Sequence, residues 1–166
     1  LGDWAPDGNL YFTALNSVLA RVPATASVGD AVEVLTEFQE RENIHGLISV
    51  LPGEKTAVFQ VWYAASGEDA EVWAIDLDTR DRRFLTAGKS PSYLSTGHLL
   101  FVTSGGALMA APFDPSSAEL TLPALSMAEG LASEAQLGVV GYGVSEDGTL
   151  AYSAGGGRGL VEPVWV

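Results

Sequence analysis

The chain has 166 residues, of which 21 are acidic and eight are basic, giving a net charge of -13 and a pI near 4.2. Such a surface repels a phosphate backbone, so the composition argues against nucleic-acid binding. Cysteine is absent, which excludes disulfides, thiolate zinc sites and cysteine nucleophiles. Hydrophobic residues make up 47% of the chain, enough for a core, but no apolar run approaches the roughly 20 residues that span a bilayer.

The first predicted element is a glycine turn followed by an alternating strand, and this pair recurs four times. The four copies are APDGNLYFTA (5–14), LPGEKTAVFQ (51–60), LSTGHLLFVT (94–103) and SEDGTLAYSA (145–154). The turn glycines are 45, 44 and 51 residues apart. An apolar residue and an aromatic residue follow each turn at matching positions: Leu10 and Phe12, Ala57 and Phe59, Leu99 and Phe101, Leu150 and Tyr152. The alternation and the tight turns predict antiparallel strands.

Further strands complete each unit. A second alternating strand follows in every unit, and a third closes the first three: SVLARV, AEVWAIDL, ALMAAPF and GLVEPVWV, then AVEVLTE, RRFLTAG and PALSMAE. Residues 74–86 are predicted to form a hairpin with its turn at 78–81. Residues 30–43 also show helical spacing, but a strand running into a polar loop is favoured because the equivalent segments are strands.

Four strands in a unit of about 45 residues predict an all-β fold of β-propeller blades. We expect about three and a half to four blades in one partial propeller domain, with units at about 1–44, 45–90, 91–137 and 138–166. The first unit keeps only the end of its first strand, and the fourth stops after its third strand. We therefore expect a fragment of a longer protein, a homodimer that pairs exposed blade edges, or a truncated chain that does both; a closed four-bladed ring is the remaining alternative.

The repeats also carry a family resemblance. WAPDGNLYFTA, WAIDLDTRDRRFLTAG and GVSEDGTLAY resemble the WD40-like, TolB-type (PD40-like) propeller repeats of bacteria. The resemblance implies a propeller that serves as an interaction domain, or one attached to a kinase or peptidase domain in similar bacterial chains. The third unit departs from the pattern, with Ser95-Thr96-Gly97 at its turn and divergent later strands.

Residues capable of catalysis are few. The two histidines are His45, which begins a predicted inner strand, and His98, which follows a turn. His45 is expected either near the channel mouth, as a binding residue, or hydrogen-bonded between blades. No G-x-S-x-G motif is present. Asp76, Asp78 and Asp81, which lie in and just before the 78–81 turn, suit backbone capping better than calcium binding. We predict no catalytic residue, metal or cofactor.

Enlarged loops give the best candidate site. The loop between the last strand of one blade and the first of the next is long at residues 37–43 and 129–136, and it opens on the same face as the loop between a blade's two middle strands. We predict a site there, expecting the acidic loop to be solvated and the aromatic pair to be partly exposed or packed in the core. Its residues are Glu37, Glu40, Arg41, Glu42, His45, Trp62 and Tyr63. The predicted function is non-catalytic binding of a protein or peptide, without nucleic acid or membrane insertion; the alternative is the propeller portion of a hydrolase, either peptidase-associated or carboxylate-based.

Overall fold

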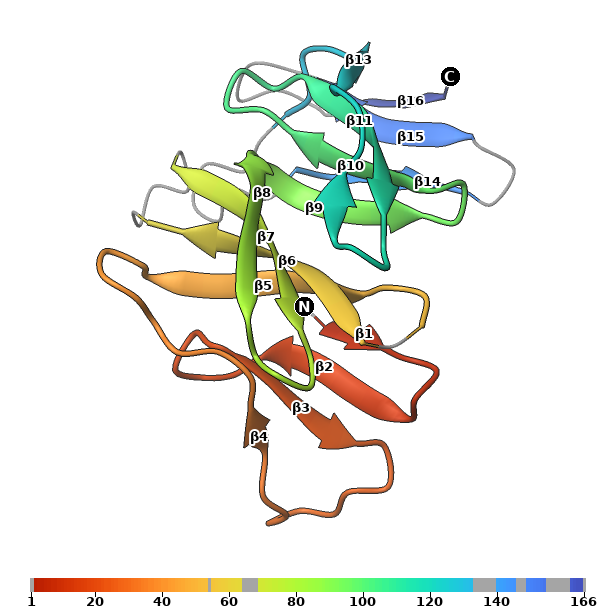
Figure 1. Ribbon diagram of the computed structural model, residues 1–166. Helices are drawn as coiled ribbons and strands as arrows, with labels where there is room; N and C mark the ends of the chain where they lie inside the picture. Colours follow the sequence, from red (N-terminus) through yellow and green to blue (C-terminus); the bar gives the residue numbers. More distant parts are fainter. Residues whose placement is uncertain are drawn as a thin grey trace.

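The computed structural model describes residues 2–53, 55–63, 69–132, 140–145 and 149–154, and the backbone of 162–165. In these residues it contains strands and no helix, arranged as four antiparallel sheets (Figure 1). The first sheet is β1 (Gly2–Trp4), β2 (Asn9–Thr13), β3 (Leu19–Pro23) and β4 (Glu33–Val34). The second is β5 (Ile44–Val50), β6 (Thr56–Trp62), β7 (Ala70–Asp76) and β8 (Arg82–Ala87).

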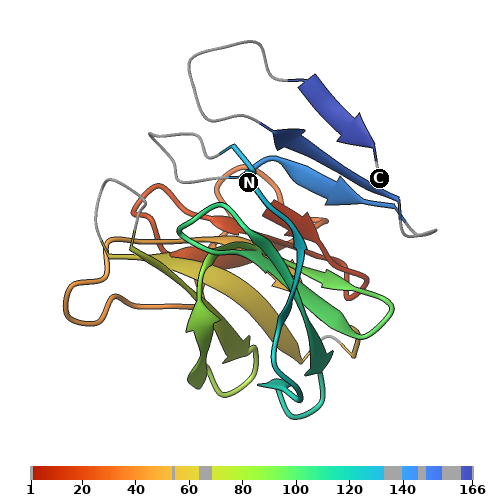
Figure 2. The same cartoon turned by 90° about the horizontal axis from the view of Figure 1, so that it is seen from above.

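The third and fourth sheets continue the repeat. The third contains β9 (Lys89–Leu94), β10 (His98–Val102) and β11 (Leu108–Asp114), with the short strands β12 (Glu119–Leu120) and β13 (Leu125–Ala128) both paired to β11. The fourth contains β14 (Tyr142–Val144), β15 (Leu150–Ala154) and β16 (Glu162–Trp165). The sheets follow one another in chain order from the first, in red, to the fourth, in blue (Figures 1 and 2). These are propeller blades, as the repeat predicts.

The hydrophobic core lies between successive blades. One cluster joins the first two blades and contains Tyr11, Leu19, Phe59 and Ile75 among its buried members. A second cluster joins the second and third blades, and a third joins the third and fourth. A hydrogen bond also joins the first strands of the first and second blades: Asp3 Oδ2 accepts the Val50 N–H at 2.7 Å.

The repeated positions of the sequence are those that face the preceding blade. Phe59 packs with first-blade residues, and Leu99 and Phe101 pack with residues of the second blade. In the first blade, the same positions carry Leu10 and Phe12, which are only partly buried. The repeated apolar positions are therefore those at which a blade contacts the preceding one. At the first blade, these positions form an apolar face that no described residue covers.

Residues 30–43 form no helix. Two of them make the strand β4, which pairs with β3, and the rest are loop. The strand prediction is confirmed, although the strand is short. The 78–81 hairpin turn also forms, and Asp76 Oδ1 accepts the N–H groups of Asp78 and Thr79 at 2.9 and 2.8 Å. In the part of the chain described, no helix is long and apolar enough to cross a membrane.

Candidate functional site

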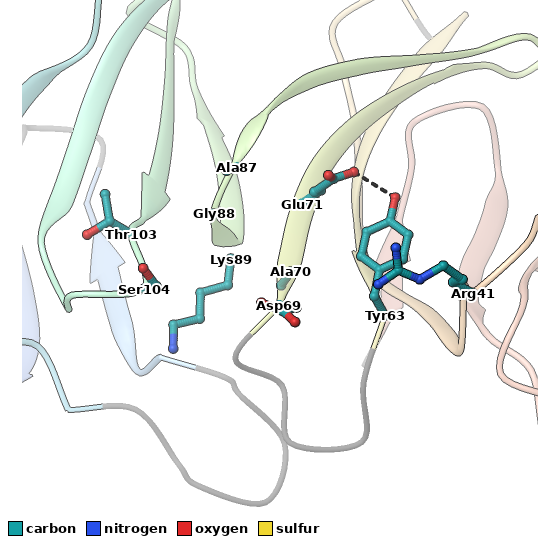
Figure 3. A pocket seen from close by; sticks show the side chains of 10 residues that line it. All are labelled: Arg41, Tyr63, Asp69, Ala70, Glu71, Ala87, Gly88, Lys89, Thr103 and Ser104. Carbon is teal, nitrogen blue, oxygen red and sulfur yellow. Dashed lines mark hydrogen bonds between the residues drawn. The ribbon is translucent and has the colours of Figure 1, made fainter.

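A pocket of about 480 Å³ opens between the second and third blades. Four connections line it: the loop between β4 and β5, the ends of β6 and β7, the junction of β8 and β9, and the residues after β10 (Figure 3). Its lining residues are Arg41, Tyr63, Asp69, Ala70, Glu71, Ala87, Gly88, Lys89, Thr103 and Ser104. We call this the interblade pocket.

Hydrogen bonds from Tyr63 and Trp73 to Glu71 hold one wall of the interblade pocket in place. The Tyr63 hydroxyl donates to Glu71 Oε2 at 2.6 Å, and the Trp73 indole Nε1–H donates to the same oxygen at 2.8 Å. Burial and the neighbouring Glu71 carboxylate both raise the pKa of Tyr63, so its hydroxyl keeps its proton at neutral pH. The wall therefore presents a preorganised phenol ring and a carboxylate held in one orientation.

Gly88 forms the narrow junction between β8 and β9. Its φ is +150°, and a Cβ placed there would lie 2.8 Å from Phe101 Cδ2 and 3.1 Å from the Val102 carbonyl oxygen. Only glycine fits this close approach of two backbones. The junction delivers Lys89, which is 6% exposed, to the pocket lining.

A second hollow, of about 410 Å³, also involves the loop before β5. Residues 34–39 and the side chains of Arg80 and Arg82 line it. The loop thus contributes to both hollows, with Glu37 lining the second and Arg41 lining the interblade pocket. Its backbone turns sharply, because Arg41 has a φ of 72° and the Glu42 N–H donates to the Gln39 carbonyl oxygen at 3.1 Å.

A buried polar cluster holds this loop against the second blade. His45 is fully buried, and its Nε2–H donates to Glu42 Oε2 at 3.0 Å. Thr36 Oγ1 accepts the Leu19 N–H at 3.0 Å, which leaves its hydroxyl hydrogen to be donated to His45 Nδ1 at 2.8 Å. Arg82 completes the cluster by donating to Glu42 Oε2 at 3.2 Å.

Both titratable groups of the buried cluster have a lowered pKa. Burial is the main cause for His45, and it keeps the imidazole neutral. For Glu42, burial opposes ionisation but is outweighed by the hydrogen bonds from the Gln39 N–H and from Arg82. The cluster is therefore a neutral histidine beside a buried carboxylate–guanidinium pair, and its groups are all directed at one another.

The structure separates the seven predicted site residues into four groups. Arg41 and Tyr63 meet in the interblade pocket, Glu37 lines the second hollow, and Glu40 is exposed on the same loop. The remaining three are buried: His45, Glu42 and Trp62.

One expectation about these residues is corrected. The acidic loop is not solvated throughout, because the Glu42 side chain is 2% exposed and paired with Arg82. Trp62 is 6% exposed, so it takes the second of its two expected placements and packs in the core. His45 occupies the hydrogen-bonded position between blades that was one of its two expected roles. Part of the second enlarged loop, residues 133–136, lies outside the described residues.

Five polar lining residues are not predicted by the sequence pattern: Asp69, Glu71, Lys89, Thr103 and Ser104. They come from the ends of the middle strands and from the junction between blades, rather than from the enlarged loops. A signal existed, because the repeat assigns all these positions to the same face of the propeller. What the sequence does not reveal is which strand ends carry their side chains into one cavity.

No protein-family model matches the chain, and no curated protein matches it in sequence. Solved structures do share its fold. TolB from Acinetobacter baumannii superposes with a TM-score of 0.64 at 16% identity, over 99% of this chain and 39% of its own. A puromycin hydrolase superposes with a TM-score of 0.67 at 18% identity, over 99% of this chain and 28% of its own.

An oligogalacturonate lyase in complex with manganese superposes with a TM-score of 0.59 at 13% identity, over 93% of this chain and 44% of its own. The chain thus spans less than half the length of each of these three proteins. At such identities the comparison shows the fold alone, a TolB-like β-propeller, and two of the three proteins are enzymes by name.

Proposed function

We propose that the protein is a non-catalytic β-propeller module that binds a protein or peptide through the face carrying the interblade pocket. The observation behind the proposal is the pocket itself. Its volume of about 480 Å³ falls within the range of roughly 300–1,000 Å³ typical of ligand sites. Its wall is preorganised by the Tyr63–Glu71 hydrogen bond, which lowers the cost of ordering side chains on binding.

The net charge of the chain also predicts the charge of the partner. With a net charge of -13, the protein attracts a partner whose surface is basic, and it accelerates their encounter. The expected partner therefore carries positive charge around the segment that enters the pocket.

Filling the pocket tests this proposal. Ser104 is exposed at the pocket lining, so Ser104→Trp should block entry without disturbing the core. Peptides selected from a random library on the unaltered protein should bind this variant at least tenfold more weakly, measured by fluorescence anisotropy. Thr25→Trp, on the exposed loop between β3 and β4, is the matched control and should bind normally. Equal binding by both variants would contradict a site in the pocket.

The alternative is that the chain is the propeller portion of a hydrolase, peptidase-associated or carboxylate-based. It is supported by the superposition on the puromycin hydrolase and by two carboxylates, Asp69 and Glu71, that line one pocket. An enzyme of the carboxylate type needs such a pair. Hydrolysis of a chromogenic glycoside or aminoacyl arylamide that is lost in Asp69→Asn would support this reading over the first.

We also propose that two copies pair through exposed blade faces. On the open side of the first blade, Trp4 is 67% and Val34 is 50% exposed, and their register places them with Leu10 and Phe12 on one apolar face. Covering this face removes apolar area from water.

Light scattering coupled to size exclusion should give a mass near twice 17.3 kDa at high concentration. Trp4→Lys should shift the protein toward the monomer, because it places a charge on the face to be buried. A monomer mass at every concentration would contradict pairing.

A further inference from the structure

We infer that the interblade pocket accepts a carboxylate of the bound peptide, supplied by an acidic side chain or by the C-terminus. This inference rests on the proposed peptide-binding function and adds the chemistry of the group that enters the pocket. The starting observation is where the positive charges lie. The protein is strongly acidic, yet two of its eight cationic side chains, Arg41 and Lys89, line this one cavity.

Arg41 differs from the other arginines that the structure describes. Of the arginines that the structure describes, four form ion pairs with carboxylates: Arg21, Arg80, Arg82 and Arg83. Arg41 forms none with any described residue, although it is exposed and lines the pocket. An exposed guanidinium that lines a pocket is suited to a bidentate bond with a carboxylate.

Lys89 supplies the second positive charge from the opposite side. Its side chain runs along the part of the pocket lined by Thr103 and Ser104, whereas Arg41 lies beside Tyr63 (Figure 3). Lys89 is 6% exposed and directly follows Gly88, where the backbone passes close to Phe101 and Val102. A carboxylate entering between the two cations would also meet hydroxyl donors.

The pocket is also lined by two acidic residues, Asp69 and Glu71, and the two differ in how they bear on a bound carboxylate. Glu71 Oε2 accepts hydrogen bonds from both Tyr63 and Trp73, so this oxygen is already occupied within the wall. Asp69, nearer the centre of the pocket in Figure 3, is placed to accept a peptide N–H or a basic side chain next to the bound carboxylate. The lining thus fits an acidic residue within a basic segment, in agreement with the partner charge expected from the whole chain.

Matched peptides separate local recognition from overall charge. The first probe is acetyl-Lys-Ala-Glu-Ala-Lys-amide, and the second has Gln in place of Glu. The third is the Gln peptide with a free C-terminal carboxylate. The protein as a whole attracts the amidated Gln peptide most, because that peptide carries the most positive charge. Tighter binding of either carboxylate peptide, by about tenfold or more in calorimetric titration, would therefore reflect local contacts with the carboxylate and not the net charge of the protein.

Variants assign that preference to residues. Arg41→Ala and Lys89→Met should each remove most of the preference for the carboxylate peptide over the Gln peptide. Arg83→Ala is the matched control, because Arg83 lies outside the pocket and pairs with Glu119. Circular dichroism should confirm that each variant is folded, and Arg41→Lys, which keeps the charge, should retain part of the preference.

The outcomes also separate this inference from the function on which it rests. If the amidated Gln peptide binds at least as tightly as both carboxylate peptides, and Ser104→Trp blocks all three, peptide binding stands and the carboxylate inference is overturned. If a carboxylate peptide is preferred but Arg41→Ala and Lys89→Met keep that preference, the assignment to this pocket is overturned. If none of the three binds, both the inference and the proposed function fail for peptides of this class.

Discussion

Phe59→Ala is expected to lower the free energy of unfolding by about 3–5 kcal/mol. Phe59 is fully buried in the cluster between the first and second blades, where it packs with Tyr11 and Leu19. Truncation removes the ring from the contact surface of two blades and leaves a cavity that rigid strands cannot fill. Urea unfolding at constant pH, followed by tryptophan fluorescence, measures the change.

Phe12→Ala is the matched control, because Phe12 occupies the same position of the repeat in the first blade. Phe12 is only partly buried, and no blade of the described chain lies against it. Its truncation should therefore cost less than half as much as that of Phe59. Equal costs would contradict the view that the repeat aromatics act through contact between blades, unless the Phe12 variant also loses the mass of a dimer.

The blades were predictable because their contacts are local in the sequence. A turn glycine, an apolar residue two positions later and an aromatic four positions later describe one strand and the face that it turns to its neighbour. Leu99 and Phe101 follow this pattern, and both lie in the interface between the second and third blades. The short strand β4 was harder to recognise, because two paired residues leave little alternation within a segment that also has helical spacing.

The site was predictable only in part, because its side chains are brought together across long sequence separations. Arg41 and Tyr63 belong to loops that the repeat assigns to one face, and the structure places both in the interblade pocket. The burial of Glu42 depends on Arg82, 40 residues further along the chain, and no local pattern indicates that pair. The sequence alone therefore predicts that the Glu42 carboxylate, which lies in an acidic loop, is exposed to solvent.

Glu42→Gln is expected to lower the free energy of unfolding by about 3 kcal/mol or more. The substitution keeps the size of the side chain but removes the charge that compensates the guanidinium of Arg82, whose side chain is only 8% exposed. Glu33→Gln is the control: Glu33 also lies between two arginines, but its side chain is 48% exposed, so its loss should cost about 1 kcal/mol or less. Similar costs for the two substitutions would contradict the assignment of a buried pair.

Lowering the pH should destabilise the folded protein through the same cluster. The folded protein holds His45 neutral with a lowered pKa, so the unfolded chain binds the extra proton as pH falls through about 6.5. Glu42 also has a lowered pKa, and its contribution is lost at lower pH, below about 4.5. The unaltered protein should therefore unfold more readily in urea at pH 5.5 than at pH 7.5, by up to about 1.4 kcal/mol per pH unit for one proton.

Glu42→Gln should keep this pH dependence, because removing the carboxylate that favours the imidazolium leaves His45 even harder to protonate. Substitution of His45 by Asn should reduce the dependence between pH 7.5 and 5.5, which assigns it to the histidine. The cluster also bears on binding, since Glu42 fixes the turn that carries Arg41. A Glu42→Gln protein that remains folded should thus lose affinity for the carboxylate peptide, although residue 42 does not line the pocket, and an unchanged affinity would show that the turn holds Arg41 in place without the buried pair.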